Sequence, residues 1–95
     1  MAAYLLVDIE ITDAAAFETY REQVPHVIAA HGGRYLVRGG TSEILEGTWR
    51  PSRTVVLEFS SMAALKGFWQ SPDYQPLRRL RERSAKSNVV AVEGV

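Results

Sequence analysis

The chain has 95 residues, of which 11 are basic and 11 acidic, and it contains no cysteine. A chain of this length typically forms one domain, and its balanced charge excludes a global field that would attract nucleic acid or a membrane surface. The absence of cysteine excludes disulfides, thiolate nucleophiles and cysteine zinc sites. The sequence shows no signal sequence and no apolar run long enough to span a membrane. Residues 1–95 are therefore expected to form a single cytoplasmic domain.

The first predicted elements are a strand and a helix. Residues 4–11 alternate between two faces, as expected of a half-buried strand. Thr12 or Asp13 is expected to cap a helix whose apolar residues recur at helical spacing. These residues are Phe17, Tyr20, Val24, Val27 and Ile28. Pro25 lies among them and predicts a kink, because proline removes one backbone hydrogen bond, and the glycine pair at 32–33 is expected to end the helix.

Two strands with a long connection between them are predicted next. Residues 34–38 alternate again, and the glycine pair that follows indicates a bulge or bend before an extended segment at 43–46. After a turn, residues 53–59 alternate strongly and predict a third strand. If the turn closes a symmetric hairpin, Glu46 faces Arg53 as a cross-strand pair of opposite charge.

The C-terminal third predicts two helical segments and a last strand. Ser60 or Ser61 is expected to cap a helix that ends before Pro72. A further helix is expected over 73–85, with a proline in its first turn, and a short strand over 89–93. The order is therefore β-α-β-β-α-β, with the second helical element divided in two.

This order predicts an α+β, ferredoxin-like fold. A four-stranded antiparallel sheet with both helical elements on one face is the simplest arrangement, because right-handed crossovers place them on the same side. The opposite face of the sheet then stays uncovered. It is expected to hold Tyr4, Leu6, Thr54 and Val56. Because an uncovered apolar face typically marks an interface, we expect a homodimer that packs sheet against sheet.

Several segments resemble one known family. They are the run HGGRYLVRGG at 31–40, LEG at 45–47, SPDY at 71–74 and VEG at 92–94. Together they make the chain similar, over nearly its whole length, to the family called domain of unknown function 1330. The resemblance implies the dimeric α+β barrel superfamily, which is similar in shape to cofactor-free monooxygenases, haem-degrading oxygenases and lactone isomerases. Shape alone does not transfer those activities.

Arg38 and Glu46 flank the glycine-rich bend and form a first candidate site. A guanidinium beside exposed glycine amides can hold a carboxylate or phosphate, with Glu46 orienting it. The alternative is a structural ion pair that fixes the bend. The bend lacks a nucleotide-binding glycine pattern, so no nucleotide site is predicted.

Aromatic residues form a second candidate site, a pocket for a small, flat organic ligand. The candidates are Tyr35, Trp49, Trp69 and Tyr74. Tyr35 and Trp69 are favoured as core residues, whereas Trp49 sits in a polar turn and needs a packing partner, either a ligand or a dimer mate. The hydroxyl of Tyr74 is expected to reach Arg81 or Glu46.

The two histidines, His26 and His31, are candidate acids or bases because they titrate near neutral pH. They lie five residues apart on the predicted helix and project in different directions, so a shared metal is not expected. His31 is favoured as a cap of the helix end, where a cation meets the negative end of the dipole. We predict no metal site and no cofactor.

A run of basic residues follows the last proline. It comprises Arg78, Arg79, Arg81, Arg83 and Lys86, with only Glu82 opposing it. A nucleic-acid surface is one interpretation, but a solvated helix face that complements the helix C-terminus is favoured. We therefore expect neither a nucleic-acid nor a membrane partner.

Three functional hypotheses follow. In the first, a homodimer binds a small anionic or aromatic metabolite between the helices and the sheet. The residues assigned to this ligand are Arg38, Glu46, Trp49, Trp69, Tyr74 and Arg81. In the second, the protein is a cofactor-free oxygenase or isomerase in which one of the two histidines abstracts a proton. In the third, it is a structural or interaction module without a small-molecule site.

Overall fold

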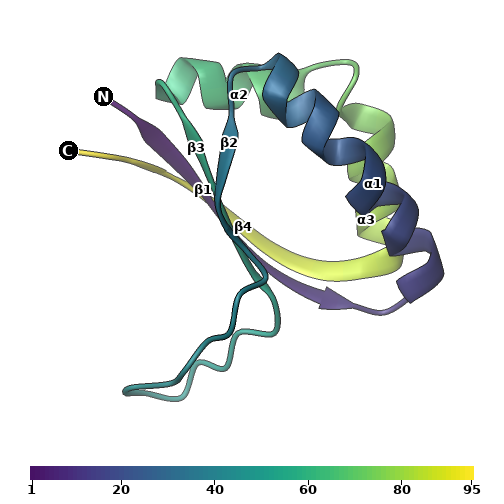
Figure 1. Cartoon of the computed structure of the whole chain (residues 1–95), viewed down its shortest axis with the longest axis vertical. Helices are drawn as coiled ribbons and strands as arrows, with labels where there is room; N and C mark the ends of the chain where they lie inside the picture. The colour runs from purple at the N-terminus through teal and green to yellow at the C-terminus, as the bar shows by residue number, and fades with distance from the viewer.

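The computed structural model describes residues 1–95 and contains four strands and three helices (Figure 1). In chain order these are β1 (Ala3–Ile11), α1 (Ala14–Ala30), β2 (Arg34–Arg38), β3 (Thr54–Phe59), α2 (Met62–Gln70), α3 (Gln75–Ser84) and β4 (Ala85–Glu93). The strands form one antiparallel sheet in the order β2-β3-β1-β4, and the helices lie along one face of it. The predicted ferredoxin-like α+β fold is confirmed. None of the helices has both the length and the apolar character that crossing a membrane requires.

The helices begin and end at residues whose chemistry suits those positions. Asp13 caps α1 by accepting a hydrogen bond from the Ala16 amide at 3.1 Å, and Ser61 caps α2 by accepting one from the Ala64 amide at 3.0 Å. The chain leaves α1 through Gly32, whose φ of 76° is a left-handed conformation that favours glycine. Both caps and the glycine end of the first helix are as predicted.

Pro25 lies inside α1 and frees a backbone carbonyl through which this helix is bonded to β2. Proline has no amide hydrogen, so the carbonyl of Arg21, four residues earlier, lacks its intrahelical donor. Arg38 of β2 supplies a substitute, because its Nη2 donates to that carbonyl at 3.4 Å. The proline that interrupts the helix ladder therefore gives the Arg38 side chain an anchor.

The core lies between the helices and the inner face of the sheet. Every second residue of β1 points toward the helices. The buried ones are Ala3, Leu5, Val7 and Ile9. At the centre, Phe68 of α2 stacks on Phe59 of β3 with 5.4 Å between ring centroids and contacts Tyr74 at 4.4 Å. Aromatic side chains of this size dominate the energetics of a small core.

The opposite face of the sheet has no cover. Leu6 of β1 lies between Val56 of β3 and Val90 of β4. Leu6 is 41% exposed and Val90 56% exposed, although both are large and apolar. The prediction that the helices cover only one face of the sheet is confirmed.

The connection between β2 and β3 differs from the prediction. Residues 43–46 are expected to be extended, but β2 ends at Arg38 and residues 39–53 form a loop that projects from the sheet (Figure 1). Strand pairing stops at Arg38, so residues 43–46 have no neighbouring strand to bond with. The expected cross-strand pair is absent as well, since Glu46 is exposed and forms no ion pair with Arg53.

The last strand is longer than predicted. It is expected over 89–93 but begins at Ala85, directly after α3 ends at Ser84. Its first four residues, 85–88, of which the last three are polar, pair with the C-terminal half of β1. Their low apolar content conceals the strand in the sequence, because the pairing partner and not the side chains determines it.

Candidate functional site

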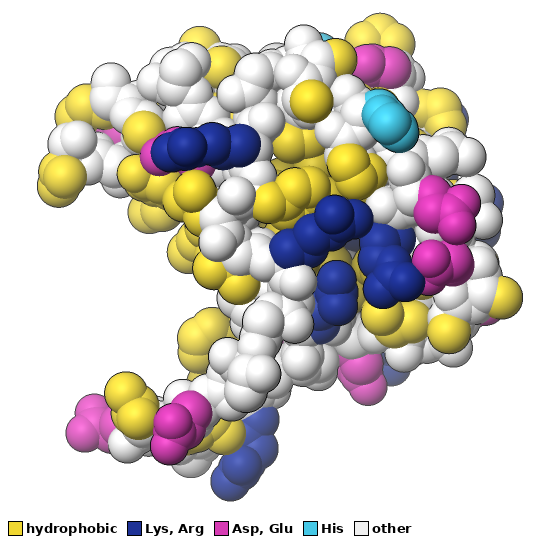
Figure 2. All heavy atoms as spheres, in the orientation of Figure 1, with side chains coloured by type: hydrophobic (Ala, Val, Ile, Leu, Met, Phe, Trp, Pro, Cys, Tyr) yellow, Lys and Arg dark blue, Asp and Glu magenta, His cyan; other side chains and the backbone are white.

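A cavity lies between the inner face of the sheet and the three helices. Its volume is about 40 Å³, which is room for a few water molecules but less than the roughly 150 Å³ that admits benzene. Of its 17 lining residues, 14 are hydrophobic, and the other three are Arg38, Arg53 and Arg81. Figure 2 shows basic side chains gathered beside an apolar hollow on this side of the molecule. The site therefore combines an apolar interior with three cations.

Arg81 is the cation that α3 turns into the core. It shares the buried side of this helix with Leu77 and Ser84 and is only 5% exposed. Its Nε donates to the Tyr74 hydroxyl at 3.4 Å, and no carboxylate lies within ion-pair distance. Burial disfavours its charge, but the interactions with Tyr74 and Tyr20 outweigh burial and raise the pKa of Arg81. Arg81 is thus a buried guanidinium that stays protonated.

The buried position of Arg81 corrects the interpretation of the basic run as one solvated face. Arg79 and Arg83 are exposed, as that interpretation requires. Arg78 packs over the Trp69 ring, with its guanidinium 4.5 Å from the ring centroid, and lies 3.9 Å from Glu82. The run therefore divides between solvent, an ion pair and the cavity, because residues 78, 79, 81 and 83 project in different directions around a helix.

Two tyrosine hydroxyls extend the polar part of the cavity. The hydroxyl oxygens of Tyr20 and Tyr74 lie 3.2 Å apart in the core. Burial, reinforced by Tyr74, raises the pKa of Tyr20 well above its ordinary value of 10, and burial also raises the pKa of Tyr35. The phenols of Tyr20 and Tyr35 therefore stay protonated at neutral pH. Arg81, Tyr74 and Tyr20 form one continuous polar chain along the helical wall.

Arg38 and Arg53 line the same cavity from the sheet. The Arg38 guanidinium lies over the Tyr35 ring, 4.7 Å from its centroid. The Arg53 guanidinium lies against Gly39, where a Cβ atom would stand only 2.4 Å from its Nη1. Gly39 also has a φ of 68°, a left-handed conformation that favours glycine, and any side chain there would displace the guanidinium end of Arg53. Neither arginine forms an ion pair.

A second cavity of about 250 Å³ adjoins the first near α3 and β4. The two share Trp69, Arg81 and Val89. The second one is more polar and includes Ser87, whose Oγ is buried without a hydrogen-bond partner. These three side chains therefore form the boundary between the two cavities.

The structure brings together only part of the predicted site. The cavity is lined by Arg38, Trp69, Tyr74 and Arg81, and also by Tyr35. Glu46 and Trp49 lie in the loop 39–53 and do not line it. Trp49 is 70% exposed and borders an apolar groove on the open sheet face. The prediction that Glu46 and Trp49 belong to the site was wrong, because the loop carries both residues away from the inner face even though they are close to Arg38 in the sequence.

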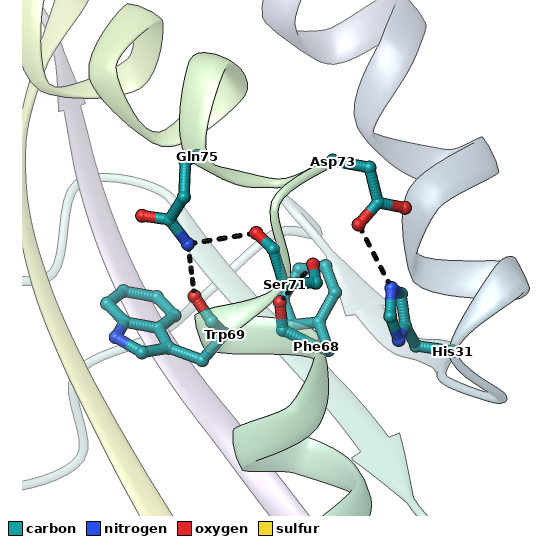
Figure 3. A network of polar contacts seen from close by, with 6 residues as sticks. All are labelled: His31, Phe68, Trp69, Ser71, Asp73 and Gln75. Carbon is teal, nitrogen blue, oxygen red and sulfur yellow. Dashed lines mark hydrogen bonds and ion pairs between the residues drawn. The ribbon is translucent and has the colours of Figure 1, made fainter.

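The histidines lie outside the cavity. His26 is exposed on α1. His31 occupies the helix C-cap position, and its Nε2 lies 3.3 Å from Oδ1 of Asp73 (Figure 3). In the same figure the Gln75 side chain donates to the carbonyls of Trp69 at 2.9 Å and Ser71 at 3.0 Å. This network joins the end of α1 to the α2–α3 turn, and no group of three acidic or histidine side chains suited to a metal occurs.

Sequence reasoning missed Arg53 and Tyr20 as cavity residues. Arg53 belongs to the same alternation as Val55 and Leu57, which are buried on the inner face. That period of two was a signal that Arg53 points inward. Tyr20 was recognisable as a core residue, but nothing in the sequence places its hydroxyl beside that of Tyr74, 54 residues later.

Comparison with solved structures supports the fold. RPA0582 of Rhodopseudomonas palustris, a protein of unknown function, is similar with a TM-score of 0.78 and 18% identity, over 99% of this chain and 82% of that one. A dimeric ferredoxin-like protein of unknown function from Jannaschia sp. CCS1 gives a TM-score of 0.68 and 18% identity, over 99% and 100%. SnoaB, a cofactor-independent oxygenase from Streptomyces nogalater, gives 0.67 and 11%, over 99% and 93%.

The sequence comparisons identify a family. No curated protein matches the chain. The model of the family described as domain of unknown function (DUF1330) matches residues 2–95. This match spans all four strands and all three helices, including the elements that carry the three cavity arginines. The chain therefore belongs to the DUF1330 family.

Proposed function

We propose that the protein binds a small organic anion with an apolar or aromatic body in the cavity between the helices and the sheet. The observation that carries this proposal is that Arg81 is buried without an acidic partner. A buried charge without a counter-charge costs free energy. An anion beside Arg81 would offset that cost.

The arrangement of donors supports an oxyanion as the ligand's polar group. Arg81 and the hydroxyls of Tyr74 and Tyr20 lie along one wall, and all three can donate hydrogen bonds. Bonds from a guanidinium to a carboxylate are stronger than bonds between neutral groups. The aromatic rings of Phe68 and Trp69 lie close by and suit a flat apolar body.

The volume of the cavity limits the size of the ligand that can bind without a change in the protein. The observed volume of about 40 Å³ admits a carboxylate-sized group but not a ring. A ring would need Trp69 to move, and that movement would add the adjoining space of about 250 Å³. We therefore expect binding to be accompanied by a change in the environment of Trp69, which tryptophan fluorescence reports.

Titration calorimetry with benzoate and its neutral analogue benzamide tests this proposal. Benzoate is expected to bind and benzamide to bind at least about tenfold more weakly, because only benzoate supplies the charge. The variant Arg81→Gln is expected to lose benzoate binding about tenfold or more. Arg79→Gln on the exposed side of the same helix is the matched control. Equal binding of benzoate and benzamide would contradict the proposal.

We also infer that two copies pair through the open faces of their sheets. The uncovered face is apolar along three strands, at Leu6, Val56 and Val90. Exposed apolar patches of this kind typically mark interfaces. The structurally similar protein from Jannaschia is described as dimeric, which supports pairing here. Sedimentation at micromolar concentrations is expected to give the mass of two chains, and a monomer there would contradict the inference.

A second candidate function is oxygenation without a cofactor, which the fold of SnoaB favours. In this alternative, Arg81 would hold the oxyanion of an ionised phenol, because the cavity offers guanidinium and phenol groups but no histidine. The test is oxygen uptake with a panel of phenols that stabilise the protein thermally. Stabilisation by a phenol without oxygen uptake would leave binding as the function.

A further inference from the structure

The charge of the cavity specifies the ligand more narrowly than its shape does. Its lining contains three guanidinium groups and no carboxylate. Other arginines nearby have acidic partners: Arg21 lies 2.6 Å from Glu18, and Arg78 lies 3.9 Å from Glu82. Arg50, Arg79 and Arg83 form no ion pair either but are exposed, whereas the three cavity arginines line one largely apolar cavity. A single carboxylate would leave two of them uncompensated.

The three arginines approach the cavity from opposite walls. Arg81 comes from α3, within the helical layer. Arg38 ends β2, and Arg53 immediately precedes β3 and accepts a backbone hydrogen bond from Ile9 of β1, so both approach the cavity from the side of the sheet. A ligand between the two walls therefore meets one cation on the helical side and two on the side of the sheet.

The arginines are held in place before any ligand is bound. Arg38 is fixed by the Tyr35 ring and by the Arg21 carbonyl that Pro25 leaves free. Arg53 packs its guanidinium against Gly39, in space that a Cβ atom would otherwise occupy. Arg38 is exposed and Arg53 is half-buried, so water solvates both charges when no ligand is bound, and an anion between the walls would replace that water.

We propose that the ligand is a dianion, which carries two negative charges on an apolar or aromatic body. In a ligand with two separate anionic groups, one group lies beside Arg81 and Tyr74 and the other faces Arg38 and Arg53. A single doubly charged group would lie among all three arginines. Two carboxylates on a ring or a doubly charged phosphate monoester both fit this charge pattern. The inference rests on the proposed binding of an organic anion and adds the charge of that anion.

Titration calorimetry at pH 7.5 with a matched set of ligands tests the proposal. Isophthalate carries two carboxylates, phenyl phosphate carries one doubly charged group, and benzoate carries a single charge on the same ring. At least one of the two dianions is expected to bind at least tenfold more tightly than benzoate. Preference for isophthalate would identify two separate carboxylates, and preference for phenyl phosphate would identify a phosphate monoester.

Variants separate the dianion from the anion in general. Arg38→Gln is expected to weaken the preferred dianion about tenfold but benzoate no more than about threefold, because benzoate has no second charge. Arg83→Gln, on the exposed surface of α3, is the control for general electrostatic attraction and is expected to change neither affinity. If benzoate binds as tightly as both dianions, the dianion inference is wrong while anion binding stands. If none of the three ligands binds, the proposed function itself is wrong.

Discussion

The same strands contribute residues to both faces of the sheet, but the inner face is buried beneath the helices and the outer face is uncovered. In β1, Leu5 and Val7 lie in the core beneath the helices, while their neighbour Leu6 faces outward without cover. The inner face also receives Arg38 and Arg53, whereas the groove on the outer face is mainly apolar and contains no basic residue. Because a strand alternates strictly, adjacent positions belong to different environments. Ligand binding and self-association should therefore be separable by substitutions only one residue apart.

The largest expected effect is the loss of stability when an aromatic ring is removed from the core beneath the helices. Phe68 is 1% exposed and packs against both Phe59 and Tyr74. Phe68→Ala is expected to lower the free energy of unfolding by about 3–5 kcal/mol, because it removes buried area and leaves a cavity. Urea denaturation measures this change. Leu45→Ala, at a side chain that is 89% exposed, is the control and should change stability by less than about 0.5 kcal/mol.

A charge on the outer face should affect association and not the inner cavity. Leu6→Lys places an ammonium group at the centre of the apolar face, between Val56 and Val90. We expect the dimer to dissociate about a hundredfold more readily, on the order of 3 kcal/mol, because the charge would be buried without a partner. Sedimentation over a range of concentrations measures the dissociation constant. An unchanged constant would show that the copies pair through another surface.

The sequence was sufficient to predict the difference between these two faces. Alternation in residues 4–11 and 53–59 separated the buried from the exposed positions, and the apolar spacing of α1 indicated which side the helix covers. The prediction of an extended strand segment at residues 43–46 was wrong because a segment becomes a strand only where a neighbouring strand pairs with it, and no strand pairs with these residues. The prediction missed residues 85–88, three of which are polar, for the opposite reason: β1 supplies a pairing partner that their composition does not suggest.

The site was predicted less completely than the fold. Arg81 follows Tyr74 by seven residues and Leu77 by four, which places all three on one side of a helix and made its burial predictable. The contribution of Arg53 was also readable from its alternation with Val55. Glu46 could not be placed from the sequence, because the path of a long loop depends on contacts that local patterns do not encode.

At alkaline pH, titration of the buried Tyr20 phenol in the core should lower the stability of the protein. The pKa of Tyr20 is raised above 10 by burial, so the folded protein retains a proton that the unfolded chain loses near pH 10. Stability from this group is therefore complete below pH 10 and declines by about 1.4 kcal/mol per pH unit above it. Tyr20→Phe is expected to flatten this decline, as measured by urea denaturation between pH 8 and 11.5. Identical slopes for the two proteins would contradict the assignment.

The smallest expected effect concerns the glycine pair at the start of the loop, where the inner face meets solvent. Gly39 has a φ of 68° and lies against the Arg53 guanidinium, whereas a Cβ atom at Gly40 would meet nothing within 4 Å. Gly39→Ala is expected to lower the free energy of unfolding by about 1 kcal/mol, because alanine disfavours the left-handed conformation, and to displace Arg53 from the cavity. Binding of isophthalate should then weaken several-fold, while Gly40→Ala should leave both quantities within error. If the two variants bind isophthalate equally well, Arg53 does not contribute to the site, and its contact with Gly39 serves only the loop.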